Sequence, residues 1–91
     1  EAGIDYELFV TNATGSTPQQ LTDTAGYQTY AAPGWSPDGS RLCVASNENG
    51  NFDIFLIDPD GNNLQQLTFS DADERAPAWS PDGSRIAFES N

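Results

Sequence analysis

The strongest constraint on this chain is a segment that it contains twice. GWSPDGSRLCVAS returns as AWSPDGSRIAFES, so that Trp35 recurs as Trp79 after 44 residues. The similarity extends along most of the chain, and the matched segments are 34–46 with 78–90, 6–15 with 52–61, and 19–22 with 65–68. A repeat of this period indicates stacked supersecondary units rather than one ordinary domain. The chain therefore holds two copies of one unit.

Four tetrapeptides of one pattern predict hairpin turns. Each opens with Asn, Ser or Asp, whose side chain can bond the local backbone, and each closes with a glycine that tolerates a left-handed conformation. The turns are Asn12–Gly15, Ser36–Gly39, Asp58–Gly61 and Ser80–Gly83. The residues that we interpret as structural rather than catalytic are Pro37, Asp38, Gly39, Pro81, Asp82 and Gly83.

Short runs rich in β-branched and aromatic residues lie between these turns and predict an all-β chain. The eight expected strands are 6–11, 19–23, 32–36, 41–46, 52–58, 64–69, 76–80 and 85–90. The four middle strands form one meander, with one hairpin before it and one after it. We therefore expect half a unit in residues 1–23, a whole unit in 24–69 and half a unit in 70–91.

The sequence WSPDGSRIAF, together with an apolar strand, a DPDG turn and QQLT, resembles the TolB-type, WD-like β-propeller repeat. This resemblance implies blades of four antiparallel strands, with the tryptophan-bearing strand innermost and the QQLT strand outermost. It implies that Trp35 and Trp79 belong to blade cores. It also explains why Ile54–Ile57 is apolar on both faces, because neighbouring blades cover each other. An extracytoplasmic, periplasmic location is a further implication.

Two blades' worth of sequence leads to an expectation about assembly. Propellers typically have four or more blades, and open blade edges invite further strand pairing. We expect head-to-tail homo-oligomers in which hairpin 76–90 of one chain completes a blade with hairpin 6–23 of the next. A homotrimer would close six blades, as in the periplasmic members of the family, and a homotetramer would close eight.

Composition excludes several classes of function. A net charge of −11 with three Lys and Arg residues disfavours nucleic acid and anionic membrane surfaces as partners. No apolar run is long enough to span a membrane. The chain has no His and no GxSxG motif, so we expect no catalytic residues. The single cysteine, Cys43, aligns with Ala87 and is interpreted as a small buried hydrophobe.

The candidate binding region is the pair of loops that join one unit to the next, 24–33 and 70–77. In a propeller these loops surround the channel mouth, where a protein or peptide partner can bind. A purely solvated loop remains an alternative. Calcium is a further one, although the segment lacks the glycine and the bidentate acid of a calcium loop, and no cofactor is expected. The candidate partner-binding residues are Tyr27, Tyr30, Asp71, Asp73, Glu74 and Arg75.

These features predict a non-catalytic propeller scaffold that assembles into a ring and binds a protein or peptide at its mouth. The chain could equally be a fragment or an engineered piece whose activity is ring assembly alone. Two other hypotheses remain open. One is the substrate-gating propeller of a prolyl-oligopeptidase-like hydrolase, and the other is a lectin-like ring that binds small ligands.

Overall fold

The computed structural model describes residues 6–23, 30–48 and 50–91, and these residues form an all-β structure. Eight strands are present among them, and no helix in this part of the chain is long and apolar enough to cross a membrane. The strands are β1 (Phe9–Val10), β2 (Gln19–Gln20), β3 (Tyr30–Trp35), β4 (Leu42–Ser46), β5 (Asp53–Ile57), β6 (Gln65–Gln66), β7 (Glu74–Trp79) and β8 (Ile86–Ser90).

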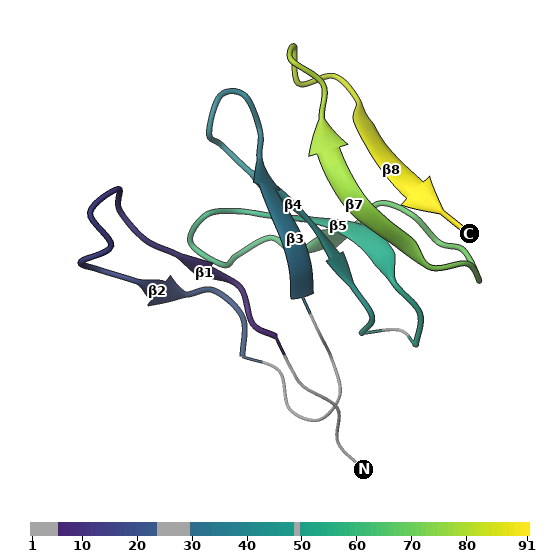
Figure 1. The fold of residues 1–91 in the computed structure, drawn as a ribbon, viewed down its shortest axis with the longest axis horizontal. Helices are drawn as coiled ribbons and strands as arrows, with labels where there is room; N and C mark the ends of the chain where they lie inside the picture. Colours follow the sequence, from purple (N-terminus) through teal and green to yellow (C-terminus); the bar gives the residue numbers. More distant parts are fainter. Residues whose placement is uncertain (1–5, 24–29, 49) are drawn as a thin grey trace.

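The strands form three antiparallel sheets. β3, β4, β5 and β6 pair in chain order as a four-stranded meander, while β1 pairs with β2 and β7 pairs with β8. The three sheets follow one another across the molecule, with the β1–β2 hairpin on one side of the meander and the β7–β8 hairpin on the other (Figure 1). This arrangement is that of propeller-type blades, in which neighbouring sheets pack face to face.

The inner strands begin earlier than the sequence predicts. Strands were expected from residues 32 and 76, but β3 begins at Tyr30 and β7 at Glu74. A register shift interrupts each ladder, between Ala31 and Gly34 in β3 and at the equivalent place in β7. Each shift contains an alanine with positive φ, 55° in the first copy and 53° in the second. These bulges let pairing resume on the other side of a proline, which cannot donate to the ladder.

The outer strands are shorter than predicted. β1, β2 and β6 each contain two residues, although six, five and six were expected. The same side-chain contacts nevertheless extend both outer pairs. The backbone N–H of Leu8 donates to Thr22 Oγ1 at 2.9 Å, and the backbone N–H of Ile54 donates to Thr68 Oγ1 at 2.9 Å. A threonine hydroxyl therefore takes the place of a backbone carbonyl at the end of each outer pair.

The core lies between the meander and the hairpins that flank it. All five residues of β4 and all five of β5 are buried, because β7 packs over one face of these strands. On the other face, Leu8 of the first hairpin joins a cluster with residues of β3, β4 and β5. The cluster consists of Leu8, Tyr30, Leu42, Val44, Phe55 and Ile57, with Val10 and Leu21 packed against it.

Candidate functional site

The acidic loop before β7 is fixed by a side chain that the sequence analysis did not select. Asn51 Nδ2 donates to the carbonyl of Ser70 at 2.7 Å and to that of Ala72 at 2.8 Å. Asp73 Oδ1 accepts a hydrogen bond from the backbone N–H of Phe52 at 3.0 Å. Asn51 thus holds the backbone of this loop, while Asp71 remains exposed to solvent.

Tyr30 and Glu74 are buried in strands of the single chain, although the sequence placed them in loops. Because both inner strands begin early, the two side chains occupy the first position of β3 and β7, and each is 6% exposed. Tyr30 donates its hydroxyl proton to Glu48 Oε1 at 2.8 Å, and burial, together with this carboxylate, raises the pKa of Tyr30. Glu74 Oε2 accepts from the Ser90 hydroxyl at 3.3 Å. Both side chains therefore hold neighbouring segments of the single chain together, Tyr30 through Glu48 and Glu74 through Ser90.

Arg75 is held by two neighbours. Its guanidinium lies 4.2 Å from the centroid of the Phe52 ring and 3.6 Å from Asp73 Oδ2. Such partly exposed contacts contribute little to stability, but they orient the arginine beside the loop. Of the predicted partner-binding residues, Asp73 and Arg75 therefore contact each other near the surface, and Asp71 is exposed in the same loop. Tyr27 lies outside the described residues.

The structure offers no ready calcium site in this region. Across residues 6–23, 30–48 and 50–91, no three acidic, cysteine or histidine side chains are grouped so that they could hold a metal ion. One Asp73 oxygen already accepts a backbone hydrogen bond, and the other contacts Arg75. These carboxylate oxygens are engaged within the fold.

Asp38 and Asp82 both serve their turns. Asp38 Oδ1 accepts hydrogen bonds from the Ser36 hydroxyl at 2.8 Å, from the Ser40 hydroxyl at 2.7 Å and from the Ser40 backbone N–H at 3.0 Å. Asp82 makes the same three contacts at 2.7, 2.8 and 3.0 Å. Hydrogen bonds to the ionised form, chiefly from the Ser40 and Ser80 hydroxyls respectively, lower the pKa of each aspartate to about 2. These contacts give both carboxylates a structural role in their turns.

Nucleophilic chemistry has no support among the described residues. The Cys43 side chain is fully buried, and burial raises the pKa of its thiol, whereas a reactive cysteine needs exposure and a lowered pKa. The whole chain contains no histidine that could act as a general base. Cys43 is instead one of the five buried residues of β4.

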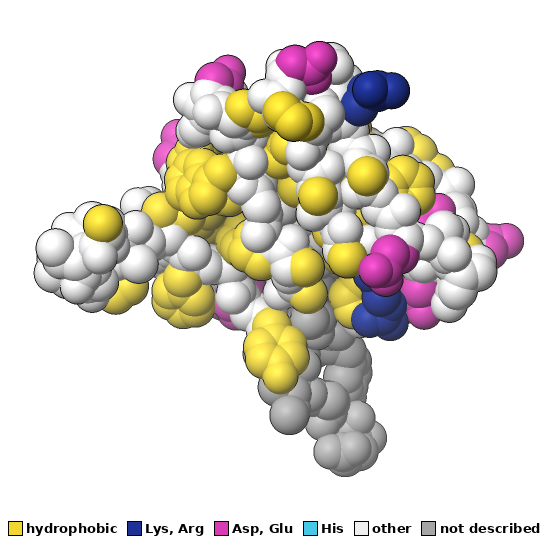
Figure 2. Space-filling view, turned by 45° about the horizontal axis from the view of Figure 1, so that its top comes forward, with side chains coloured by type: hydrophobic (Ala, Val, Ile, Leu, Met, Phe, Trp, Pro, Cys, Tyr) yellow, Lys and Arg dark blue, Asp and Glu magenta, His cyan; other side chains and the backbone are white. Residues whose placement is uncertain are grey.

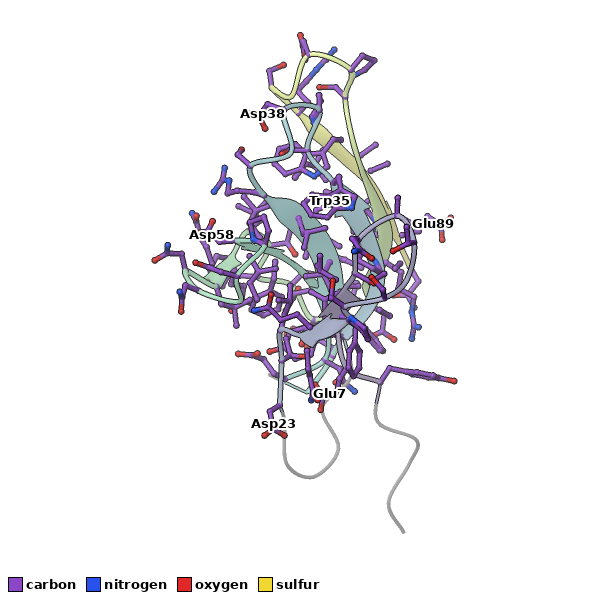
Figure 3. The ribbon with its side chains drawn as sticks, turned by 90° about the vertical axis from the view of Figure 1, so that its left-hand side faces the viewer. Glu7, Asp23, Trp35, Asp38, Asp58 and Glu89 are labelled. Atoms are coloured by element: carbon purple, nitrogen blue, oxygen red, sulfur yellow. The ribbon has the colours of Figure 1, made fainter. Side chains whose placement is uncertain are left out.

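The two tryptophans have different surroundings, and the expectation of a core position is not met by Trp35 in the single chain. Trp79 is half-buried against the meander, and its indole N–H donates to the carbonyl of Gly34 at 3.1 Å. Trp35 is 51% exposed. The difference arises because Trp79 faces a four-stranded sheet, whereas the only described structure facing Trp35 is the two-stranded β1–β2 hairpin (Figure 3).

Apolar grooves lie beside both two-stranded hairpins. A groove of about 220 Å³ lies between β1 and β3 and includes Trp35, Phe9 and Leu42 in its lining. A neighbouring groove of about 440 Å³ extends along the same strands. At the opposite end, a groove of about 410 Å³ follows β7 and β8 and includes Ala78 and Ala87. Figure 2 shows exposed hydrophobic side chains, in yellow, spread over the molecular surface. These three grooves therefore follow the strands of the described residues.

Comparison with known proteins agrees with this architecture. The model of the TolB beta propeller domain matches residues 6–91. The chain is 40% identical over 53 residues to the Tol-Pal system protein TolB of Xanthomonas campestris pv. campestris (strain B100). It is 42% identical over 53 residues to that of Xanthomonas oryzae pv. oryzae (strain PXO99A). Each match covers 58% of this chain and 12% of the relative, so the chain spans a small part of the curated relatives it matches.

Solved structures show the same fold. A TolB-type protein from Agrobacterium tumefaciens superposes with a TM-score of 0.85 and 25% identity, over 93% of this chain and 30% of the other. The tricorn protease superposes with a TM-score of 0.66 and 22% identity, over 92% of this chain and 8% of the protease. At this identity, the second similarity is one of fold alone.

Proposed function

Because the chain belongs to the TolB beta propeller domain family, we propose that it is a non-catalytic propeller scaffold whose copies associate head to tail into a closed ring. In this ring the β7–β8 hairpin of one copy supplies the inner strands of a blade. The β1–β2 hairpin of the next copy supplies the outer strands. The closed ring would present the loops around residues 70–75 at its channel mouth.

One observation carries the proposal: equivalent strands are buried in one copy of the repeat and exposed in the other. β4 lies between β3 and β5 and is covered by β7, and all five of its residues are buried. β8 has the equivalent sequence but pairs with β7 alone, and four of its five residues are exposed. An open edge beside an apolar face favours association with another strand.

The β1–β2 hairpin has the same internal contacts as β5 and β6, the outer pair of the internal blade. Thr22 Oγ1 donates to Glu7 Oε1 at 2.6 Å, as Thr68 Oγ1 donates to Asp53 Oδ1 at 3.3 Å. β1 pairs with β2 in the register that β5 uses with β6. The first hairpin therefore has the conformation of an outer half-blade, with the inner edge of β1 available for β8 of another copy.

The pairing inside the internal blade, β3–β6, predicts the register of the joint, which is the pairing of β8 of one copy with β1 of the next. β4 pairs with β5 so that Val44 lies opposite Phe55, and the repeat carries this pair onto Phe88 and Phe9. Phe88 is 42% exposed and Phe9 is 55% exposed in the single chain. The complete set of expected pairs is Ile86 with Thr11, Ala87 with Val10, Phe88 with Phe9, Glu89 with Leu8, and Ser90 with Glu7.

Three copies close six blades and four copies close eight. We favour the trimer because six blades are the number that the family resemblance implies, and the tetramer is the alternative. The association is heterologous, so its size is decided by the rotation between successive blades. The high negative charge of each copy opposes association, and added salt is expected to strengthen it.

A protein or peptide partner at the channel mouth is the second part of the proposal. Asp71 is exposed, and Asp73 and Arg75 lie close to it, so that a ring would repeat these charges around one opening. A partner with basic side chains suits this surface. An extracytoplasmic location is part of the proposal, and the similarity to Tol-Pal system proteins supports it. The gating domain of a hydrolase and a lectin-like ring remain alternatives.

Native mass spectrometry and sedimentation equilibrium test the assembly. The expected result is a folded species with three times the 9.8 kDa mass of one chain, which dissociates on dilution. Four times that mass would support the eight-bladed alternative. A folded species of one chain at all concentrations would contradict the proposed function.

A further inference from the structure

We infer that the Trp35 indole is the anchor that one copy inserts into the preceding copy of the ring, where the backbone carbonyl of Ala78 is its acceptor. This inference rests on the proposed function, because the acceptor belongs to the hairpin that completes the hybrid blade. It assigns a specific contact to the groove between β1 and β3. The occupant of that groove is the β7–β8 hairpin of the second copy.

The internal repeat provides the template for this contact. Trp79 ends β7, packs on the meander and donates its indole N–H to the carbonyl of Gly34 at 3.1 Å. In the 44-residue repeat, Trp35 is the equivalent of Trp79 and Gly34 is the equivalent of Ala78. The same geometry, moved back by one blade, brings the Trp35 indole to the Ala78 carbonyl of the preceding copy.

The surroundings of Trp35 fit this role. Among the described residues, none accepts a hydrogen bond from the Trp35 indole, and half of the side chain is exposed beside the groove of about 220 Å³. Leu42, which is opposite Trp35 in the ladder, lines the same groove. In Figure 3, seen from the β1–β2 side, Trp35 lies between the Asp38 turn and Glu7. An indole is well suited to such a place, because it combines a large apolar surface with one hydrogen-bond donor.

The acceptor side is equally specific. Gly34 lets the next blade approach closely, since a Cβ there would lie 3.4 Å from Cys43 Sγ and 3.9 Å from the carbonyl oxygen of Pro77. In the second repeat of the same chain, the equivalent ladder pair is Ala78 and Ala87. Ala78 stands where the first repeat has Gly34, and Ala87 stands where it has Cys43. The small residues Gly34 and Ala78 thus leave room for the strand of the neighbouring blade that carries the tryptophan.

The contact is tested with Trp35→Phe, Trp79→Phe and Ala78→Val, compared with the wild type by sedimentation equilibrium. Trp35→Phe keeps an aromatic ring but removes the donor, and it is expected to raise the dissociation constant of each joint about tenfold, as for one lost hydrogen bond in an excluded site. Ala78→Val changes an exposed position of the single chain and is expected to weaken association by at least as much. Trp79→Phe is the matched control, because its hydrogen bond lies within one chain.

Tryptophan fluorescence gives a second reading of the same site. In Trp79→Phe the only indole is Trp35, and its emission is expected to shift to shorter wavelength as concentration rises and copies associate. Association with unchanged Trp35 emission, and with equal dissociation constants for Trp35→Phe and wild type, would overturn the anchor but not the ring. A wild-type mass of one chain at all concentrations would overturn both. The groove would then belong to an adjoining repeat of a longer chain or to another partner.

Discussion

Glu89 should oppose assembly, and replacing it with alanine should strengthen the ring. Glu89 is the equivalent of Ala45, which is 1% exposed where β7 covers the internal blade. The side chain of Glu89 is exposed in the single chain (Figure 3), and the proposed joint would cover it. Arg75 lies opposite Glu89 in the ladder, but its guanidinium contacts Asp73 and Phe52. The carboxylate would therefore lose water without gaining a dedicated partner.

The size of the effect follows from the cost of burying a polar group that lacks a partner, which is about 1–3 kcal/mol and more for a charged group. Since about 1.4 kcal/mol corresponds to a factor of ten in affinity, Glu89→Ala should tighten each joint roughly five- to 150-fold. Sedimentation equilibrium over a dilution series measures this directly. Asp23→Ala is the control, because it removes one negative charge from an exposed position at the end of the first hairpin that takes no part in the expected pairing of β8 with β1.

Two outcomes refute this reasoning. If Glu89→Ala and Asp23→Ala tighten association equally, the effect is one of net charge and the Glu89 position is not covered. If Glu89→Ala weakens association, the carboxylate has a favourable partner in the assembly and the proposed register is wrong.

Three further predictions concern the single chain. The pKa of Asp38 and that of Asp82 are both about 2, below the ordinary 3.8, so their contribution to stability is present above about pH 4 and is lost as the pH falls toward 2. In Asp38→Asn, the free energy of unfolding measured with urea should therefore depend less on pH over that interval. The same pH dependence in the variant and the wild type would contradict the turn network. Gly61→Ala should cost at least about 1 kcal/mol more than Gly15→Ala, because both have positive φ but only a Cβ at Gly61 would meet a backbone oxygen, at 2.8 Å; equal costs in thermal unfolding would refute the close packing of that turn. Thr68→Val should destabilise the chain by about 1–3 kcal/mol, since it leaves a part-buried backbone N–H of β5 without its acceptor; Thr68→Ser is the control and should retain most of the stability.

The fold could be predicted from the sequence because the repeat, the turn residues and the strand periodicity all indicate the same structure. The division of the strands into a pair, a meander of four and a second pair is the one observed. The starts of the inner strands were not predicted, because a proline at position 33 or 77 normally interrupts a ladder. The bulges at Ala32 and Ala76, with positive φ, are the feature that a one-dimensional pattern does not reveal.

The candidate site was less predictable for the same reason. The early starts of β3 and β7 bury Tyr30 and Glu74, which a loop assignment would leave exposed. Asn51 was not selected, although it fixes the loop before β7, because its partners are backbone carbonyls that carry no sequence signal. The repeat itself contained one missed signal: Glu7 with Thr22 and Asp53 with Thr68 recur at matching positions.

Amide hydrogen exchange of β8 tests most directly whether copies complete one another's blades. The N–H groups of Ile86–Ser90 that point away from β7 have no strand beside them among the described residues, whereas β4 has one on both sides. The account predicts that these β8 amides become protected to the level of β4 at high protein concentration and lose that protection on dilution. Rapid exchange of β8 at every concentration, with β4 protected throughout, would contradict it.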